Sequence, residues 1–134
     1  MAPTCPCGLP QPYEACCGRF HDGRDVPATA EQLMRSRYSA FAVGDESYLL
    51  DTWHPDTRPT GIRPDPRQQW VRLEVLRTSG GGLFDAEGTV AFRATSRIGT
   101  RDVVVVEDSR FTRSDGRWSY VGPVGGPPRT AAEA

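Results

Sequence analysis

Four cysteines crowd into the first seventeen residues, as a C-x-C pair and a C-C pair: Cys5, Cys7, Cys16 and Cys17. Thiolates this close together repel one another, and a soft divalent cation relieves that repulsion by binding four sulfurs in a tetrahedral array. Gly8 and Gly18 follow the two pairs, where the backbone must turn tightly to aim the sulfurs at one point. Four sulfurs leave no open coordination position, so the pattern predicts one zinc ion with a structural role.

Free thiols and disulfides are the competing interpretations of these cysteines. Neighbouring Cys16 and Cys17 do not easily join each other, and a bond between Cys5 and Cys7 closes a strained ring. The N-terminus lacks the charged and apolar parts of a secretion signal, so we expect the protein in the cytoplasm, where stable disulfides are rare. His21 is a reserve ligand in place of the Cys17 sulfur, or alternatively a surface loop residue.

Charge and composition exclude two classes of partner. The chain has 134 residues, which is the size of one ordinary domain, and its 16 positive charges are all arginines, set against 17 acids. The formal net charge of −1 gives no basic surplus, so we expect no nucleic-acid partner. No apolar run approaches the roughly 18–20 residues of a membrane helix, so we expect no membrane association either.

Two helices are predicted after a short polar linker over 22–28. Thr29 is a suitable N-cap, and apolar side chains recur on one face of a helix that begins at Ala30 and ends at Gly44. A second, short helix is predicted from about 45 to 53, and Pro55 ends it. The prolines between 54 and 69 exclude regular structure there.

Four strands follow, recognised by alternating apolar residues. The alternating positions are Val71, Leu73 and Val75, then Val90, Phe92 and Ala94, then 103–106, and last 118–121. Turn signals separate the strands, and Asp115-Gly116 is a strong hairpin signal. The pattern predicts an α+β fold in which two or three helices pack on a curved antiparallel four-stranded sheet. Such a layout often leaves a pocket between the helices and the concave face.

Arg37 stands close to the middle of the apolar face of the first long helix. A buried cation without a partner costs several kcal/mol, so the fold must supply a carboxylate or leave the position open to a ligand. Glu107 interrupts the apolar alternation of the third strand. We therefore hypothesise that Arg37 and Glu107 pair across a ligand pocket with Tyr38 and His54 at its rim; a buried ion pair without any ligand is the alternative.

His54 and the three tryptophans have competing interpretations as well. An imidazole titrates near neutrality, which makes His54 and the carboxylate of Glu107 the catalytic candidates. His54 also follows the second helix, where an imidazole is able to cap carbonyls and stabilise the negative end of the helix dipole. The tryptophans are expected to be core residues, since no basic stripe accompanies them.

Four stretches of the chain carry a resemblance to known families. The N-terminal pattern is similar to the SEC-C zinc motif, best known from the SecA translocase motor: Cys5-Pro6-Cys7-Gly8, Tyr13 and Cys16-Cys17-Gly18. With three further segments the chain resembles the YchJ family of small bacterial proteins: Leu33-Met34-Arg35-Ser36-Arg37-Tyr38-Ser39-Ala40-Phe41, Thr52-Trp53-His54-Pro55 and Ser109-Arg110-Phe111. The resemblance implies a zinc knuckle over 1–21 and a nuclear-transport-factor-two-like domain over 29–124, and the tail over 125–134 is expected to be disordered.

Three functions compete. The first is a binding or adaptor module, in which the knuckle presents a surface to a protein partner and the pocket accepts a small molecule. The second is a cone-fold enzyme in which His54 or Glu107 moves protons on a small substrate. The third, implied by the resemblance alone, is an accessory of the SecB chaperone or the ribosome. The segment between the cysteine pairs lacks the lysines of the SEC-C motifs that make those contacts, and we favour the first function.

Overall fold

Helices and strands occupy separate halves of the chain. The computed structural model describes residues 4–62, 65–124 and 129–132. The first half contains a 3-10 turn and three helices: η1 (Tyr13–Ala15), α1 (Cys17–His21), α2 (Ala30–Val43) and α3 (Glu46–Asp51). The second half contains five strands: β1 (Gln68–Gly80), β2 (Glu87–Ile98), β3 (Arg101–Ser114), β4 (Arg117–Pro123) and β5 (Arg129–Ala132). Within the described residues, no helix is long and apolar enough to cross a membrane.

Local sequence signals set the bounds of the two helices that cover the sheet. Thr29 caps α2, its side-chain oxygen accepting a hydrogen bond from the Gln32 amide at 3.1 Å. Gly44 ends α2 in the left-handed region, with φ of 77°, which glycine adopts without strain. Asp45 then caps α3 by accepting from the Tyr48 amide at 3.1 Å. The predicted pair of helices is confirmed, and the second is shorter than predicted.

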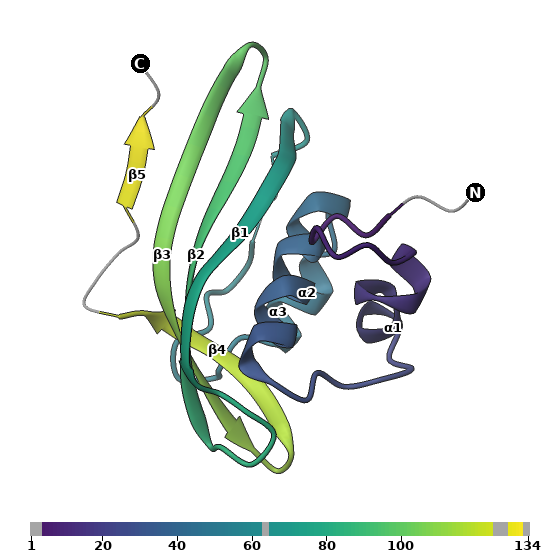
Figure 1. Cartoon of the computed structure of the whole chain (residues 1–134), viewed down its shortest axis with the longest axis vertical. Coiled ribbons are helices and arrows are strands. Elements are labelled where there is room, and N and C mark those ends of the chain that lie inside the picture. The colour runs from purple at the N-terminus through teal and green to yellow at the C-terminus, as the bar shows by residue number, and fades with distance from the viewer. Residues whose placement is uncertain (1–3, 63–64, 125–128, 133–134) are drawn as a thin grey trace.

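The strands form the predicted antiparallel meander in the order β1-β2-β3-β4. Asp115 and Gly116 both have positive φ, 54° and 77°, which is the geometry of a two-residue hairpin turn between β3 and β4. The sheet curves around α2 and α3, and α1 lies beyond α2, away from the sheet (Figure 1). The α+β architecture expected from the sequence is therefore confirmed.

Bulges in β1 change which of its residues face the helices. The register with β2 shifts between Trp70 and Arg72, so Val71 is an extra residue, and a second shift follows Val75. Val71 is 51% exposed, whereas Trp70 and Leu73 face the core. The predicted alternation from Val71 to Val75 is thus wrong at Val71. The extra residue at the bulge shifts the alternation by one, so Trp70 faces the core in place of Val71.

Part of the C-terminal segment is a strand. We expected a disordered tail over 125–134, but Arg129–Ala132 form β5, which pairs with β3 along 103–106. The pairing corrects the expectation for those four residues; 125–128 and 133–134 lie outside the described residues. The physical reason is that β4 pairs only with 109–114, which leaves the adjoining edge of β3 open to another backbone.

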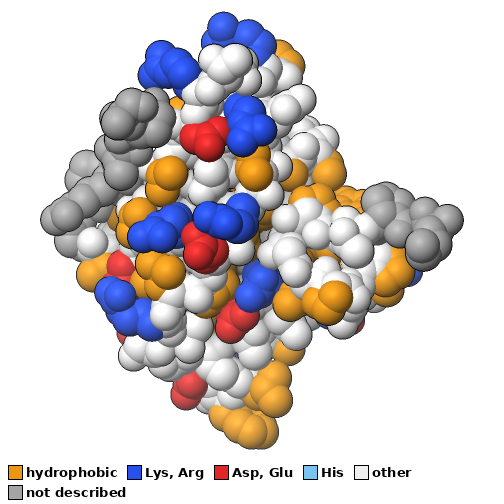
Figure 2. Space-filling view, turned by 45° about the horizontal axis from the view of Figure 1, so that its top comes forward, with side chains coloured by type: hydrophobic (Ala, Val, Ile, Leu, Met, Phe, Trp, Pro, Cys, Tyr) orange, Lys and Arg blue, Asp and Glu red, His pale blue; other side chains and the backbone are white. Residues whose placement is uncertain are grey.

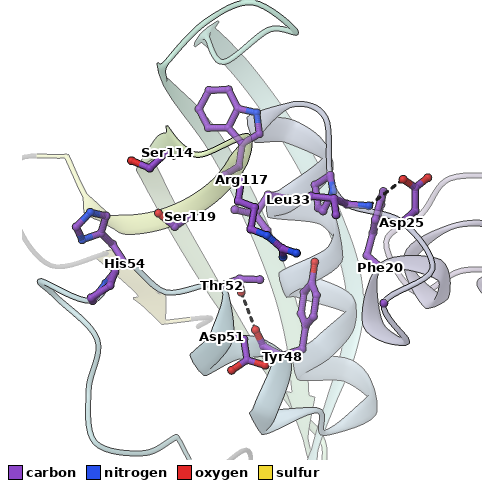
Figure 3. A pocket seen from close by; sticks show the side chains of 15 residues that line it. Phe20, Asp25, Leu33, Tyr48, Asp51, Thr52, His54, Ser114, Arg117 and Ser119 are labelled. Carbon is purple, nitrogen blue, oxygen red and sulfur yellow. Dashed lines mark hydrogen bonds between the residues drawn. The ribbon is translucent and has the colours of Figure 1, made fainter.

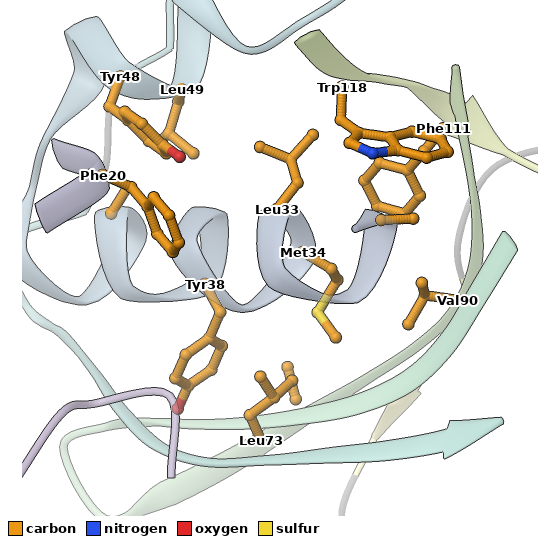
Figure 4. Packing of buried hydrophobic residues seen from close by; sticks show 13 residues of the cluster. Phe20, Leu33, Met34, Tyr38, Tyr48, Leu49, Leu73, Val90, Phe111 and Trp118 are labelled. Atoms are coloured by element: carbon orange, nitrogen blue, oxygen red, sulfur yellow. The ribbon is translucent and has the colours of Figure 1, made fainter. Parts of the chain in front are cut away.

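The core lies between α2 and the concave face of the sheet. Leu33 and Met34 of α2 meet side chains from three strands, among them Val90, Phe111 and Trp118 (Figure 4). The Trp118 indole nitrogen donates to the Ala28 carbonyl at 3.1 Å, which fastens the segment before α2 to β4. This packing places one side of α2 toward the sheet and the other toward the N-terminal segment.

Candidate functional site

The four cysteines meet at one buried point. Their sulfur atoms all lie within 4.8 Å of one another, and those of Cys7 and Cys16 are 3.7 Å apart. All four thiols are free and buried. Tetrahedral coordination with bonds of about 2.3 Å places sulfurs about 3.8 Å apart, so this donor set fits a four-sulfur metal site.

Thiol ionisation within the cluster also favours a cation. Hydrogen bonds from the thiols of Cys17 and Cys7 lower the pKa of Cys5, whereas burial raises the pKa of Cys16 to about 12. The hydrogen bond with Cys5 also raises the pKa of Cys17. Burial and the neighbouring thiol thus oppose ionisation of Cys16 and Cys17, and a positive ion among the sulfurs would offset that cost.

His21, the reserve ligand, is occupied elsewhere. Its Nε2 donates to the Ser36 carbonyl of α2 at 2.8 Å, and its Nδ1 lies 2.5 Å from the Tyr13 hydroxyl. The ring also packs against Tyr48, with centroids 4.6 Å apart. Because both ring nitrogens have hydrogen-bond partners, Cys17 rather than His21 supplies the fourth donor, and His21 fastens the knuckle to α2.

Two further contacts join the cysteine cluster to α2. The Ser39 hydroxyl lies 3.6 Å from the Cys5 sulfur, and the Arg35 guanidinium donates to the Cys7 carbonyl at 2.9 Å. The residues that hold the sulfurs in place are therefore on the side of α2 that faces away from the sheet.

A cavity of about 540 Å³ lies on the other side of α2, against the concave face of the sheet. We call it the aromatic cavity because half of its lining residues are aromatic, from α2, from Trp53 just after α3 and from all four meander strands. It is lined by Met34, Arg37, Tyr38, Phe41, Trp53, Trp70, Phe92, Ala94, Val105, Glu107, Ser109, Phe111, Tyr120 and Pro123.

Arg37 lies in this cavity, 6% exposed, but does not pair with Glu107. Its Nη1 donates to the Leu49 carbonyl at 2.8 Å and to the Thr52 hydroxyl at 2.7 Å, at the C-terminal end of α3. Burial lowers its pKa to about 10, which leaves it charged at neutral pH. The hypothesised ion pair is wrong among the described residues, because oxygens at the end of a helix accept the guanidinium protons instead.

Tyr120 stands between the two charged residues. Its ring centre lies 4.6 Å from the Arg37 guanidinium carbon, and its hydroxyl donates to Glu107 Oε2 at 2.7 Å. Burial raises the pKa of Tyr120, and the bond to Glu107 adds to that shift, so the hydroxyl keeps its proton. Ser109 donates to the same carboxylate oxygen at 2.5 Å. Sequence reasoning missed both residues, although Ser109 lies two positions from Glu107 and therefore on the same strand face.

Tyr38 reaches from the aromatic cavity toward the cysteines. Its ring meets Trp70 edge-on, with centroids 5.5 Å apart, and its hydroxyl points toward the N-terminal segment (Figure 4). That hydroxyl is buried and makes no hydrogen bond to any described residue. Burial raises the pKa of Tyr38 to about 12, with a smaller contribution from Cys7. Tyr38 thus belongs to the cavity wall, as hypothesised.

His54 lies outside the aromatic cavity. It belongs to a different, outer cleft of about 420 Å³ lined by Leu33 and residues from 20–27, 48–55 and 114–119, where Arg117 stands between His54 and Asp25 (Figure 3). Its Nδ1 accepts from the Asp56 amide at 3.1 Å rather than capping helix carbonyls. The structure therefore separates the two proposed acid–base residues, His54 and Glu107, into different hollows.

Charges of both signs are interspersed on the face shown in Figure 2, with apolar side chains between them. Ion pairs join several charged side chains of the protein, including Arg97 with Asp102 at 2.8 Å and Arg77 with Asp108 at 3.4 Å. The Asp108 side of β3 carries such pairs, and the Glu107 side lines the aromatic cavity. The absence of a nucleic-acid partner stays a prediction.

The sequence is similar to one family model and to bacterial relatives. The family model described as "YchJ, middle NTF2-like domain" matches residues 29–123. A UPF0225 protein of Streptomyces avermitilis is 55% identical over 118 residues, which cover 88% of this chain and 81% of that protein. A UPF0225 protein of Streptomyces coelicolor is 54% identical over 118 residues, with 88% and 92% covered.

Two solved structures resemble the whole arrangement. The solution structure of a SEC-C motif containing protein from Rhodopseudomonas palustris matches with a TM-score of 0.75 and 30% identity over 100% of both chains. The crystal structure of a SEC-C motif containing protein from Psychrobacter arcticus matches with a TM-score of 0.74 and 27% identity, covering 90% of this chain and 81% of that one. The similarity therefore includes the N-terminal knuckle as well as the sheet.

Proposed function

Because the chain belongs to the YchJ-like family with its NTF2-like domain, we propose that it is a ligand-binding module stabilised by one structural zinc ion. The observation that carries the proposal is the aromatic cavity. Its volume of about 540 Å³ is within the range of roughly 300–1,000 Å³ typical of small-molecule sites, and its wall is apolar apart from a few polar groups.

The zinc ion has the role of holding the knuckle on α2. Among the described residues, the apolar side chains that pack against the cysteine cluster are those of Leu9 and Tyr13, and a core this small is not stable alone. Four thiolates favour zinc over harder cations, and a saturated site has no position for substrate or water. Bound zinc would supply folding free energy and no catalytic chemistry.

Native mass spectrometry tests the metal. We expect the intact chain to carry one zinc ion and to lose it in Cys16→Ser. A metal-free protein whose residues 4–21 remain ordered would overturn this part of the proposal.

Fluorescence titration with N-phenyl-1-naphthylamine, a neutral apolar probe, tests the cavity. We expect saturable binding to the wild type and loss of binding in Ala94→Leu. Ala94 is a buried residue of the cavity wall, and the larger leucine side chain would fill part of the cavity. Val71→Leu, on the exposed side of the sheet, is the matched control and keeps the affinity. Equal binding by wild type and both variants would place the probe elsewhere and refute the cavity as the site.

The placement of the acid–base candidates favours binding over catalysis. His54 and Glu107 lie in different hollows, so a shared substrate does not reach both. Recognition of a protein partner by the knuckle stays a prediction, and so does the chaperone or ribosome contact. The exposed residues between the cysteine pairs include Glu14 and no basic side chain, so the lysines of the SEC-C motifs that contact the chaperone or the ribosome are missing here.

A further inference from the structure

The aromatic cavity contains two opposite charges and few other polar groups. Among the residues that line it, Arg37 and Glu107 are the charged ones, so the fixed charge inside sums to zero. A ligand with a net charge would meet one attracting and one repelling charge, so little would offset the loss of its own hydration on entering the apolar wall. An uncharged ligand avoids this cost.

The two charged side chains differ in how many of their hydrogen-bonding atoms have partners in the protein. Arg37 Nη1 bonds two oxygens at the end of α3, and its guanidinium lies against the rings of Trp53, at 5.0 Å, and Tyr120, at 4.6 Å. It is thus largely committed to joining α2, α3 and β4. Its role is structural.

Glu107 is satisfied at one oxygen only. Tyr120 and Ser109 both donate to Oε2, whereas Oε1 accepts no hydrogen bond from any described residue. Two donors on one oxygen fix the orientation of the carboxylate on the cavity wall. The other oxygen is then a fixed acceptor on a mostly apolar wall, and hydrogen bonds to charged acceptors are stronger than those between neutral groups.

We propose, on the basis of the cavity function above, that the ligand is an uncharged, ring-containing molecule whose hydroxyl or N–H group donates to Glu107 Oε1. The rings of Phe41, Trp70 and Phe92 provide the apolar wall for its body. Orientation comes from the unoccupied Oε1 of Glu107, which discriminates against ligands of the same shape that lack a donor.

Calorimetric titration with four naphthalenes of similar size tests this ligand class. The probes are 2-naphthol, 2-methoxynaphthalene, naphthalene-2-carboxylate and 2-naphthylmethylammonium. We expect 2-naphthol to bind about tenfold more tightly than 2-methoxynaphthalene, the difference of one hydrogen bond to a carboxylate, and more tightly than both charged probes.

Variants locate the effect at Glu107. In Glu107→Leu the acceptor is lost, so the preference for 2-naphthol over 2-methoxynaphthalene should disappear, and the carboxylate probe should gain affinity because Arg37 is then unbalanced. Glu87→Gln, at an exposed position of β2, removes the same charge and should leave the order of the four affinities unchanged.

The outcomes separate the two proposals. If 2-methoxynaphthalene or a charged probe binds the wild type as tightly as 2-naphthol, the ligand class is overturned and cavity binding stands. If none of the four probes nor N-phenyl-1-naphthylamine binds, the proposed function itself fails. The comparison among probes uses the wild-type protein, so it holds even if Glu107→Leu does not fold.

Discussion

The guanidinium carbon of Arg37 lies 4.6 Å from the centre of the Tyr120 ring, and the hydroxyl of the same ring donates to Glu107. One aromatic side chain thus contacts both charged residues of the cavity. The two charges therefore have different roles, since Arg37 joins α3 to α2 and Glu107 keeps an oxygen free on the cavity wall.

Replacing Arg37 tests its structural role. Arg37→Met should lower the free energy of unfolding by about 2 kcal/mol, because it removes two charge-assisted hydrogen bonds and leaves the buried Leu49 carbonyl with a weaker partner. Urea denaturation measures the loss. Arg72→Met, at an exposed position on the outer side of β1, is the control and should change stability by less than about 0.5 kcal/mol. A loss no larger than that of the control would contradict the assignment.

His21 is predicted to matter for stability and not for metal content. His21→Ala removes hydrogen bonds to Tyr13 and to the Ser36 carbonyl, so we expect a destabilisation of about 1–2 kcal/mol with one zinc ion still bound. Cys17→Ser, in contrast, should lose the metal. Zinc content by native mass spectrometry distinguishes the two, and a metal-free His21→Ala would restore His21 as a ligand.

Removal of the metal should unfold the knuckle before the sheet. A chelator takes away the interaction that gathers the four thiols, and the cluster has few other apolar contacts. Hydrogen exchange should therefore rise over 4–21, whereas β2 and β3, each paired on both sides along part of its length, keep their protection. Uniform loss of protection in every element would instead show that the sheet depends on the metal.

Stability should decline at alkaline pH because of buried tyrosines. Their ordinary pKa is 10.0, and burial raises the pKa of Tyr38 and Tyr48 to about 12 and also raises that of Tyr120. Between pH 10 and 12 the folded chain therefore binds more protons than the unfolded chain. The stability from these hydroxyls is complete below pH 10 and is lost as pH rises through 12.

Arg37 acts in the opposite direction in this pH range. Burial lowers its pKa from 12.5 to about 10. The free-energy cost of burying its charge therefore decreases as pH rises and the guanidinium loses its proton in the folded state. One such group does not offset three tyrosines, and we expect the urea midpoint to fall between pH 10 and 12. The fall should be shallower in Tyr48→Phe. A flat profile, or one equally steep in the variant, would contradict this account.

The sequence by itself determined the features that depend on near neighbours. Thr29 and Gly44 bound α2 because capping is a property of one turn of helix, and Asp115-Gly116 makes its hairpin because both residues tolerate positive φ. Spacing likewise predicted that Cys5, Cys7, Cys16 and Cys17 would meet, since short loops confine their sulfurs.

Only the tertiary structure decided which distant groups become partners. The position of Arg37 on its helix correctly predicted burial, but the oxygens that accept its protons belong to α3 and the residue after it, and the ring beside it belongs to β4. His54 lies in a separate cleft, and Val71 lies at a bulge with its side chain exposed. Periodicity tells which side of an element is buried; the partner on the opposite element depends on how the sheet bends, and that bend is set by the packing of the whole chain.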